Sequence, residues 1–366
     1  MRFRTIDGLR GIAALAVVLY HLNAAARLTF EDWLPGWLDW LLRQGFLGVD
    51  IFFVLSGFVI AYSVRRADPS LRYLGLFAVR RSIRLDPPYW TAMFLEIAVQ
   101  SVALRLGLSD APLPSIEQVI AHFFYLQNLL GYGDIVSIFW TLCFEIQFYL
   151  FLVTLLVVRK HLLALLGPRP TEWISGIALA ALFVLSVLMR YEIGGLTAPQ
   201  GVAIIRWFQF FIGVCLWWVA SGRVHWSALV AMWGFLVAVI VLEGVEPQQT
   251  LPIFVSGLIW WSYRRDRMAT VLSGPVIQWL GTISYSLYLF HTTIGWRFVR
   301  ISGKFGGQNA SLWTSAPIFL AGVLICVVAA WLAWRLIERP SMDFSRRVAL
   351  PKDAPVPERR TEGRLE

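Results

Sequence analysis

The chain of 366 residues is 58% hydrophobic and only 15% charged, and its mean hydropathy is +0.64. A water-soluble domain carries about 25% charged residues, so this composition excludes a soluble globular protein, a disordered chain and a disulfide scaffold. The net charge of +9 does not indicate nucleic-acid binding, because the excess of Arg follows the pattern of membrane topology described next. We therefore expect an all-α membrane protein.

Ten apolar stretches follow one another along the chain, and most have the length of about 20 residues that a spanning helix needs. The eighth is the weakest, because only about 14 residues separate Gln248 from Arg264. The predicted spans lie near residues 9–26, 46–64, 88–106, 138–158, 173–190, 202–221, 226–242, 249–263, 276–298 and 315–337.

Charged residues between these stretches predict the topology, since Lys and Arg gather on the cytoplasmic side of membrane proteins. Residues 107–137 contain neither Lys nor Arg, whereas 65–84 contain six Arg. Ten spans with both termini in the cytoplasm place every basic group on one side, and omission of the eighth span would move 264–267 to the wrong side. The basic groups are the N-terminus, 65–84, 159–169, 223, 264–267 and the segment after 335.

These patterns predict one domain, residues 1–342, built as a polytopic bundle of about ten transmembrane helices. Residues 343–366 are polar and rich in Pro, and we expect them to form a disordered cytoplasmic tail. The three cysteines lie inside apolar stretches and match neither a disulfide nor a metal-site pattern, so we expect packing roles for them and no metal site. Gly45, Gly48 and Gly57 of the second span are expected to permit close helix contacts.

Ionisable residues inside a bilayer are costly and are therefore candidates for function. Arg10 and His21 are eleven residues apart, which places them on one face of the first helix and about 16 Å apart along its axis. We expect Arg10 at the cytoplasmic entrance and His21 in the outer half of the membrane. The alternative, which such a pair alone would favour, is an Arg that snorkels to the interface and a His hydrogen-bonded in the core.

Glu145 lies in a span that enters from the Lys-free loop, at a depth comparable with that of His21. A carboxylate beside an imidazole suits general-base catalysis, because the carboxylate orients the ring and stabilises the imidazolium. A structural Glu paired with another helix explains Glu145 equally well. His291 could line the same cavity, but an interface anchor is the favoured interpretation. Glu96 is expected to pair with a neighbouring helix and receives no catalytic role.

Residues 65–84 form the second group of interest. Topology and binding of anionic lipid explain most of these Arg residues. Arg81 and Arg84, however, are three residues apart and share a helix face just before Pro87 and Pro88. Because guanidinium groups bind phosphate through two parallel hydrogen bonds, this pair predicts a site for a phosphorylated ligand.

Six sequence features, in order from residue 3 to about 340, resemble the signatures of the acyltransferase family 3 of membrane proteins. Each is weak alone, but together on a chain of about ten spans they form a specific pattern. They are the Arg10 and His21 pair, the segment Gly45–Phe58, the Arg81 and Arg84 pair before Pro88-Tyr89-Trp90, Trp140 to Glu145 with Phe148-Tyr149, Ser284–His291, and Ile337-Glu338-Arg339-Pro340.

The resemblance implies an integral membrane O-acyltransferase of the bacterial cytoplasmic (inner) membrane. It would move an acyl group, most often acetyl, from cytoplasmic acyl-CoA to a hydroxyl of a cell-surface or lipid-linked polysaccharide. By this resemblance, Arg10 and His21 correspond to the essential pair of the family, and Arg81 and Arg84 to its CoA-phosphate contacts. We expect His21 to act as general base, with Glu145 orienting its ring. We also expect acetyl-CoA to be the donor substrate and the protein to hold no permanently bound cofactor.

Two other functions remain open at this stage. A transporter or flippase of lipid-linked sugars could use the same buried charges for a proton or substrate path, but it would work without acyl-CoA and leaves Arg81 and Arg84 unexplained. A non-catalytic membrane partner of a polysaccharide assembly system would tolerate the loss of His21.

Overall fold

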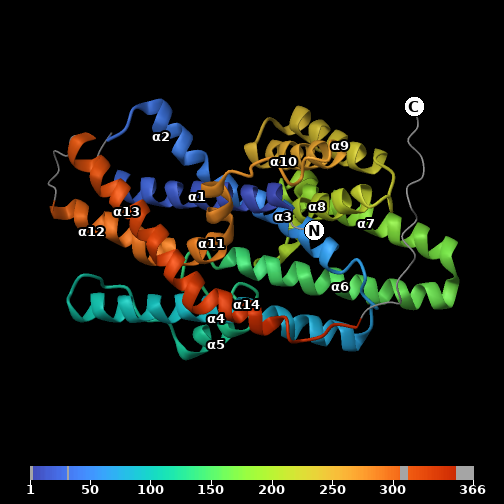
Figure 1. Cartoon of the computed structure of the whole chain (residues 1–366), viewed down its shortest axis with the longest axis horizontal. Helices are drawn as coiled ribbons and strands as arrows, with labels where there is room; N and C mark the ends of the chain where they lie inside the picture. Colours follow the sequence, from blue (N-terminus) through green and yellow to red (C-terminus); the bar gives the residue numbers. More distant parts are fainter. Residues whose placement is uncertain (1–2, 31–32, 306–311, 352–366) are drawn as a thin grey trace.

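The computed structural model describes residues 3–30, 33–305 and 312–351, and within these ranges the chain forms helices and loops without a strand (Figure 1). The predicted all-α class is confirmed. The helices are α1 Arg4–Arg27, α2 Gly36–Arg43, η1 Gln44–Leu47, α3 Gly48–Ser63, α4 Leu71–Arg105, α5 Ile116–Phe123, α6 Trp140–Leu166, α7 Pro168–Arg190, η2 Ile193–Gly195, η3 Ala203–Arg206, α8 Trp207–Ala220, α9 Ser227–Glu243, α10 Pro247–Arg264, α11 Pro275–His291, η4 Thr292–Trp296, α12 Arg297–Phe305, α13 Leu312–Ala333, η5 Trp334–Glu338 and α14 Arg339–Ser345.

Several of these helices are long and apolar enough to cross a membrane, so the chain is a multi-pass membrane protein. Each of the ten predicted stretches contains a helix, but about six segments meet the length and hydropathy of a span, and Ser227–Glu243 is apolar but shorter. The count of ten therefore stays a prediction. The six segments are Arg4–Arg27, Gly36–Ser63, Trp140–Leu166, Pro168–Arg190, Ala203–Ala220 and Ser315–Ser345.

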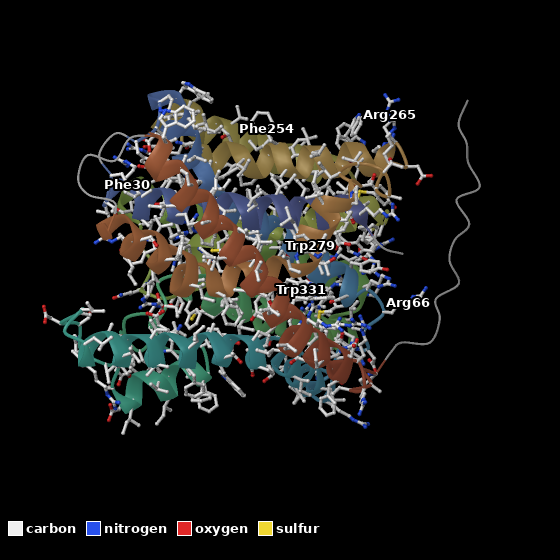
Figure 2. The ribbon with its side chains drawn as sticks, turned by 60° about the vertical axis from the view of Figure 1, so that its left-hand side comes forward. Phe30, Arg66, Phe254, Arg265, Trp279 and Trp331 are labelled. Atoms are coloured by element: carbon white, nitrogen blue, oxygen red, sulfur yellow. The ribbon has the colours of Figure 1, made fainter. Side chains whose placement is uncertain are left out.

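The two ends of the bundle differ in their side chains. Figure 2 shows Arg66 and Arg265 at the same end, although about 200 residues separate them, and Phe30 at the opposite end. The segments that carry two of the basic groups therefore meet at one end, as the charge alternation predicts.

The helices α1 and α11 approach each other closely. A Cβ atom added at Gly11 would lie 2.7 Å from the backbone N of Gly281, and one at Gly281 would collide with the carbonyl of Asp7. Small residues are needed where helix backbones approach this closely. The contact holds the two helices that carry His21 and His291 in a fixed relative position.

The glycines of the second predicted span behave as expected. A Cβ atom at Gly45 or Gly48 would collide with the backbone of α1, and one at Gly57 would collide with the carbonyl of Phe210 in α8. α3 is therefore packed between α1 and α8. The three cysteines, Cys143, Cys215 and Cys326, are buried and unpaired, which confirms their packing role.

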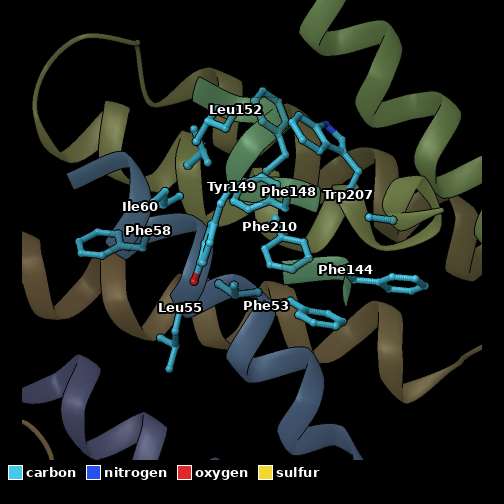
Figure 3. Close-up of a cluster of buried hydrophobic side chains, with 14 of the residues drawn as sticks. Phe53, Leu55, Phe58, Ile60, Phe144, Phe148, Tyr149, Leu152, Trp207 and Phe210 are labelled. Atoms are coloured by element: carbon cyan, nitrogen blue, oxygen red, sulfur yellow. The ribbon is translucent and has the colours of Figure 1, made fainter. Parts of the chain in front are cut away.

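Aromatic side chains of α3, α6 and α8 form much of the core (Figure 3). The rings of Phe148 and Phe210 stack with centroids 4.2 Å apart, and Phe53 lies 4.5 Å from Phe210. Such pairs stabilise a core beyond the burial of their area. The cluster fixes the position of α6 and, with it, of Glu145 and Tyr149.

Near the C-terminus, the π-helical turn η5 joins α13 to α14, and α14 packs against α4. The predicted tail, 343–366, begins within α14, which continues to Ser345. Its last part, 352–366, lies outside the described residues.

Candidate active site

A cavity of about 90 Å³ lies inside the bundle, and we call it the inner cavity. Four of the predicted site residues, Arg10, Arg81, Arg84 and Glu145, line it together with Glu338 of η5. The sequence prediction that these groups share one site is consistent with this arrangement. The remaining lining residues are Val49, Phe52, Phe53, Leu55, Ser56, Val59, Leu85, Thr141, Leu142, Tyr149, Ser284, Tyr285 and Tyr288.

A second cavity of about 230 Å³, the peripheral cavity, has Arg81 and Arg84 in common with the inner one. Arg80 and Arg346 join them, so four guanidinium groups line the same space. The other residues around it are Ser63, Phe77, Met342, Ser345 and Leu350. Because Arg81 and Arg84 line both cavities, this Arg-rich space adjoins the cavity that Glu145 lines.

Three guanidinium groups of the inner cavity are not neutralised by direct contacts. Within the described ranges, Arg10, Arg81 and Arg84 form neither a hydrogen bond nor an ion pair at contact distance. Arg346 pairs with Asp343 at 3.1 Å, but its side chain remains 67% exposed. A space lined by unpaired guanidinium groups is suited to an anionic ligand, and a phosphate is the anion that matches their geometry best.

Glu145 takes part in a network at the centre of the inner cavity. It accepts hydrogen bonds from the hydroxyls of Ser56, at 2.8 Å, and Tyr149. The guanidinium of Arg81 lies 4.6 Å from the centre of the Tyr149 ring. In Figure 3 the hydroxyl of Tyr149 extends from the aromatic cluster toward Leu55, another residue of the cavity wall. Tyr149 therefore links a cation of the wall to the Glu145 carboxylate.

Glu338 supplies a second carboxylate that the sequence did not assign a role. It accepts hydrogen bonds from the backbone N–H and the hydroxyl of Ser286, at 3.2 and 2.6 Å. It also interacts electrostatically with Arg10 and Arg84. The available signal was its place in the Ile337-Glu338-Arg339-Pro340 feature, directly after the predicted span 315–337.

His21 lies beside His291. Nε2 of His291 is 3.1 Å from Nδ1 of His21, and Nδ1 of His291 is 2.8 Å from the carbonyl oxygen of Tyr288. His291 is completely buried, so its interpretation as an interface anchor was wrong. The sequence could not pair two side chains that lie 270 positions apart.

The structure does not bring Glu145 to His21. None of the contacts within the described part of the chain joins them, and Glu145 faces Ser56 and Tyr149 instead. The rings of Phe52 and Tyr288 line the inner cavity with their centres 5.8 Å apart, and the Tyr288 ring lies 5.9 Å from that of His291. Tyr288 therefore borders both the inner cavity and the histidine pair.

Glu96 has a structural position, as expected from the sequence. Its carboxylate pairs with Arg297 and accepts a hydrogen bond of 2.7 Å from the hydroxyl of Thr293. This connects α4 to the turn that directly follows His291.

Comparison with known proteins identifies the family of the chain. A family model described as an acyltransferase domain matches residues 3–335. The chain belongs to the acyltransferase family 3. This confirms the resemblance derived from the six sequence features. No solved structure matches the chain.

Relatives of this acyltransferase-family chain cover almost all of it. A Bacillus subtilis protein, YrhL, whose name proposes a peptidoglycan O-acetyltransferase, is 28% identical over 94% of the chain. A Staphylococcus aureus (strain COL) protein, whose name proposes an O-acetyltransferase, is 26% identical over 92% of the chain. In both cases the match covers 56% of the relative, so the chain spans about half the length of these curated relatives.

A third relative is closer in length. BcsY of Komagataeibacter xylinus, whose name proposes a membrane-bound transacylase, is 28% identical over 94% of the chain and 84% of its own length. The match thus accounts for most of that protein.

Proposed function

We propose that this chain is a membrane O-acyltransferase that moves an acyl group, with acetyl expected, from cytoplasmic acyl-CoA to a hydroxyl of a cell-surface or lipid-linked polysaccharide. The observation that carries the proposal is the junction of the two cavities at Arg81 and Arg84. A donor with a phosphorylated head and a long, narrow arm fits this arrangement. The name of the Bacillus subtilis relative, which proposes acetyl transfer to peptidoglycan, supports this class of acceptor.

The donor would bind with its phosphates in the peripheral cavity, where Arg80 and Arg346 face Arg81 and Arg84. Guanidinium forks bind phosphate oxygens in pairs. The arm would then extend along the inner cavity past Glu145. Acyl-CoA is a substrate in this scheme, and it leaves as free CoA after each turnover.

The chemical step needs one general base, and His21 is the candidate. Its imidazole takes the proton of the acceptor hydroxyl while the hydroxyl oxygen bonds to the thioester carbonyl carbon. The C–S bond then breaks, and the CoA sulfur leaves with the proton returned by His21. Arg10 lines the inner cavity and contributes positive charge there.

The orientation in the membrane follows from the same scheme. We propose ten spans in a bacterial cytoplasmic membrane, with both termini and the peripheral cavity on the cytoplasmic side, where acyl-CoA is available. The common end of Arg66 and Arg265 (Figure 2) supports this orientation. The acceptor then approaches from the opposite side, where His21 lies near the end of α1.

Mass spectrometry of surface polysaccharide tests the proposal, with cells that carry the wild-type gene, no gene, or the His21→Ala variant. We expect an acyl group on the polysaccharide only with the wild-type gene, because removal of a general base lowers a rate by about 10²–10⁴-fold. Membrane levels of the variant are measured in parallel. Wild-type acylation in cells with a normally inserted His21→Ala protein would contradict the role of His21, and unchanged polysaccharide without the gene would contradict the function itself.

A further inference from the structure

The hydrogen bonds of His291 define which of its nitrogens carries a proton. Nδ1 lies 2.8 Å from the carbonyl oxygen of Tyr288, and a carbonyl can only accept, so Nδ1 must be the donor. In a neutral imidazole the other nitrogen, Nε2, is then an acceptor with a free lone pair. The ring is fully buried, which favours this uncharged form.

The same reasoning extends to His21. Its Nδ1 atom lies 3.1 Å from the acceptor Nε2 of His291 and 2.9 Å from the carbonyl oxygen of Val17. Both partners need a donor, so Nδ1 of His21 carries the proton and shares it between them. The lone pair of neutral His21 is therefore on Nε2, which is the nitrogen free to take a proton from an acceptor hydroxyl.

We propose that His291 is the positioning residue of His21: it fixes the ring and tautomer of the base and stabilises the imidazolium that forms during transfer. This rests on the proposed function, in which His21 is the base. The Tyr288 carbonyl, His291 and His21 form a chain of hydrogen bonds in which a buried imidazole takes the place that a carboxylate has in hydrolase triads. Glu145, which we expected in that place from the sequence, binds Ser56 and Tyr149 instead.

The surroundings hold His291 firmly enough for this task. The chain continues from His291 into the π-helical turn η4, a type of turn that is frequent at functional sites. Thr293 and Arg297 tie this turn to Glu96 of α4. On the other side, the contact between Gly11 and Gly281 fixes α11 against α1. The distance between the two imidazoles is thus set by backbone contacts and not by the side chains alone.

Two substitutions of similar size separate this role from simple packing. In His291→Gln, the amide oxygen reaches the position of Nε2 and can accept from His21. In His291→Asn, the shorter amide stays near the position of Nδ1, so it can bind the Tyr288 carbonyl but cannot reach His21. His161→Asn is a matched control. Nδ1 of the exposed His161 lies 2.9 Å from the backbone carbonyl oxygen of Val157. Among the described residues, however, no second imidazole bonds to His161.

The assay uses the full-length chain in inverted membrane vesicles of a producing bacterium, with [¹⁴C]acetyl-CoA supplied at the cytoplasmic face and label counted in the polysaccharide. We expect His291→Asn to lower the maximal rate about 10- to 100-fold, the effect of a lost hydrogen bond to a charged group. The KM for acetyl-CoA should stay within about twofold. His291→Gln should remain within about threefold of wild type, and His161→Asn should match it.

Equal rates for the Gln and Asn variants, whether both normal or both low, would overturn the positioning role. A raised KM with a normal maximal rate would also overturn it, because His291 would then act in donor binding. The failure of the proposed function has a different signature, namely wild-type labelling of the polysaccharide in vesicles from cells without the gene. Wild-type labelling with His21→Ala would instead contradict the role of His21 as the base.

Discussion

The guanidinium of Arg81 lies 4.6 Å from the centre of the Tyr149 ring, a distance at which a cation is attracted to the face of an aromatic side chain. The hydroxyl of the same ring donates a hydrogen bond to Glu145. Tyr149 therefore couples a residue of the proposed phosphate site to the carboxylate inside the inner cavity. We interpret Glu145 as a group that balances the cations of the donor path and shapes it.

This interpretation predicts the effect of Glu145→Gln. The amide keeps the shape of the side chain but loses the negative charge that accepts hydrogen bonds from Ser56 and Tyr149, so the donor arm should be held less well. We expect a rate of acyl transfer about tenfold lower, corresponding to one lost hydrogen bond to a charged group. Transfer of label from acetyl-CoA in membrane vesicles measures it.

Glu172→Gln is the matched control, because Glu172 is exposed on α7 and should not affect the rate. Equal rates for the two variants would show that the charge of Glu145 has no part in the reaction.

The ten-span topology predicts opposite sides for two loops. A cysteine introduced at Ser115 should react with a membrane-impermeant maleimide in intact cells, whereas one at Arg72 should react only after permeabilisation. Both positions are exposed, and the native cysteines are buried, which keeps background labelling low. Reaction of the Ser115 cysteine only after permeabilisation would exclude this topology.

The segment before α6 should respond to pH through His122. Nε2 of its ring accepts a hydrogen bond from the backbone N–H of Ile135 at 3.0 Å, which requires the neutral form. Burial lowers the pKa of His122 below its ordinary value of 6.5, against an opposing backbone hydrogen bond to Gln118. The stabilisation is therefore complete above about pH 6.5 and is lost as the pH falls through the lowered pKa.

Thermal unfolding of the purified protein between pH 8 and pH 5 measures this effect. We expect the wild-type protein to lose stability below pH 6.5, and His122→Gln to lose less, since its side chain does not titrate. A parallel loss in both proteins would assign the pH dependence to other groups.

The all-α class and the places of many residues along the helices could be predicted from the sequence, because the length of each apolar stretch and the alternation of charge between stretches are local properties. Arg81 and Arg84 were predicted as a pair from their spacing, and they line the same two cavities. The depth of Glu145 along its helix could be estimated in the same way.

Contacts between helices could not be predicted. The depth of a residue in the membrane does not define which helix faces meet. The contact of His21 with His291 depends on the close backbone approach of α1 and α11 at Gly11 and Gly281. Arg346 was missed for another reason, since polar residues after 342 resemble a tail and only the packing of α14 against α4 brings this residue to the peripheral cavity.

The central claim is that Arg81 and Arg84 bind the phosphates of acyl-CoA. Replacement of both by Lys keeps the positive charge and the topology signal but removes the planar fork that binds two phosphate oxygens. The matched control is the double Lys replacement of Arg65 and Arg66, neither of which lines a described cavity.

Binding of acetyl-CoA to the purified full-length protein and the two double variants tests this claim most directly. Each hydrogen bond to a charged group contributes about 1.5–3 kcal/mol, so the Arg81/Arg84 variant should bind at least about tenfold more weakly. The Arg65/Arg66 variant should bind like wild type. Wild-type affinity in both variants would contradict the account and leave Arg81 and Arg84 as topology residues only.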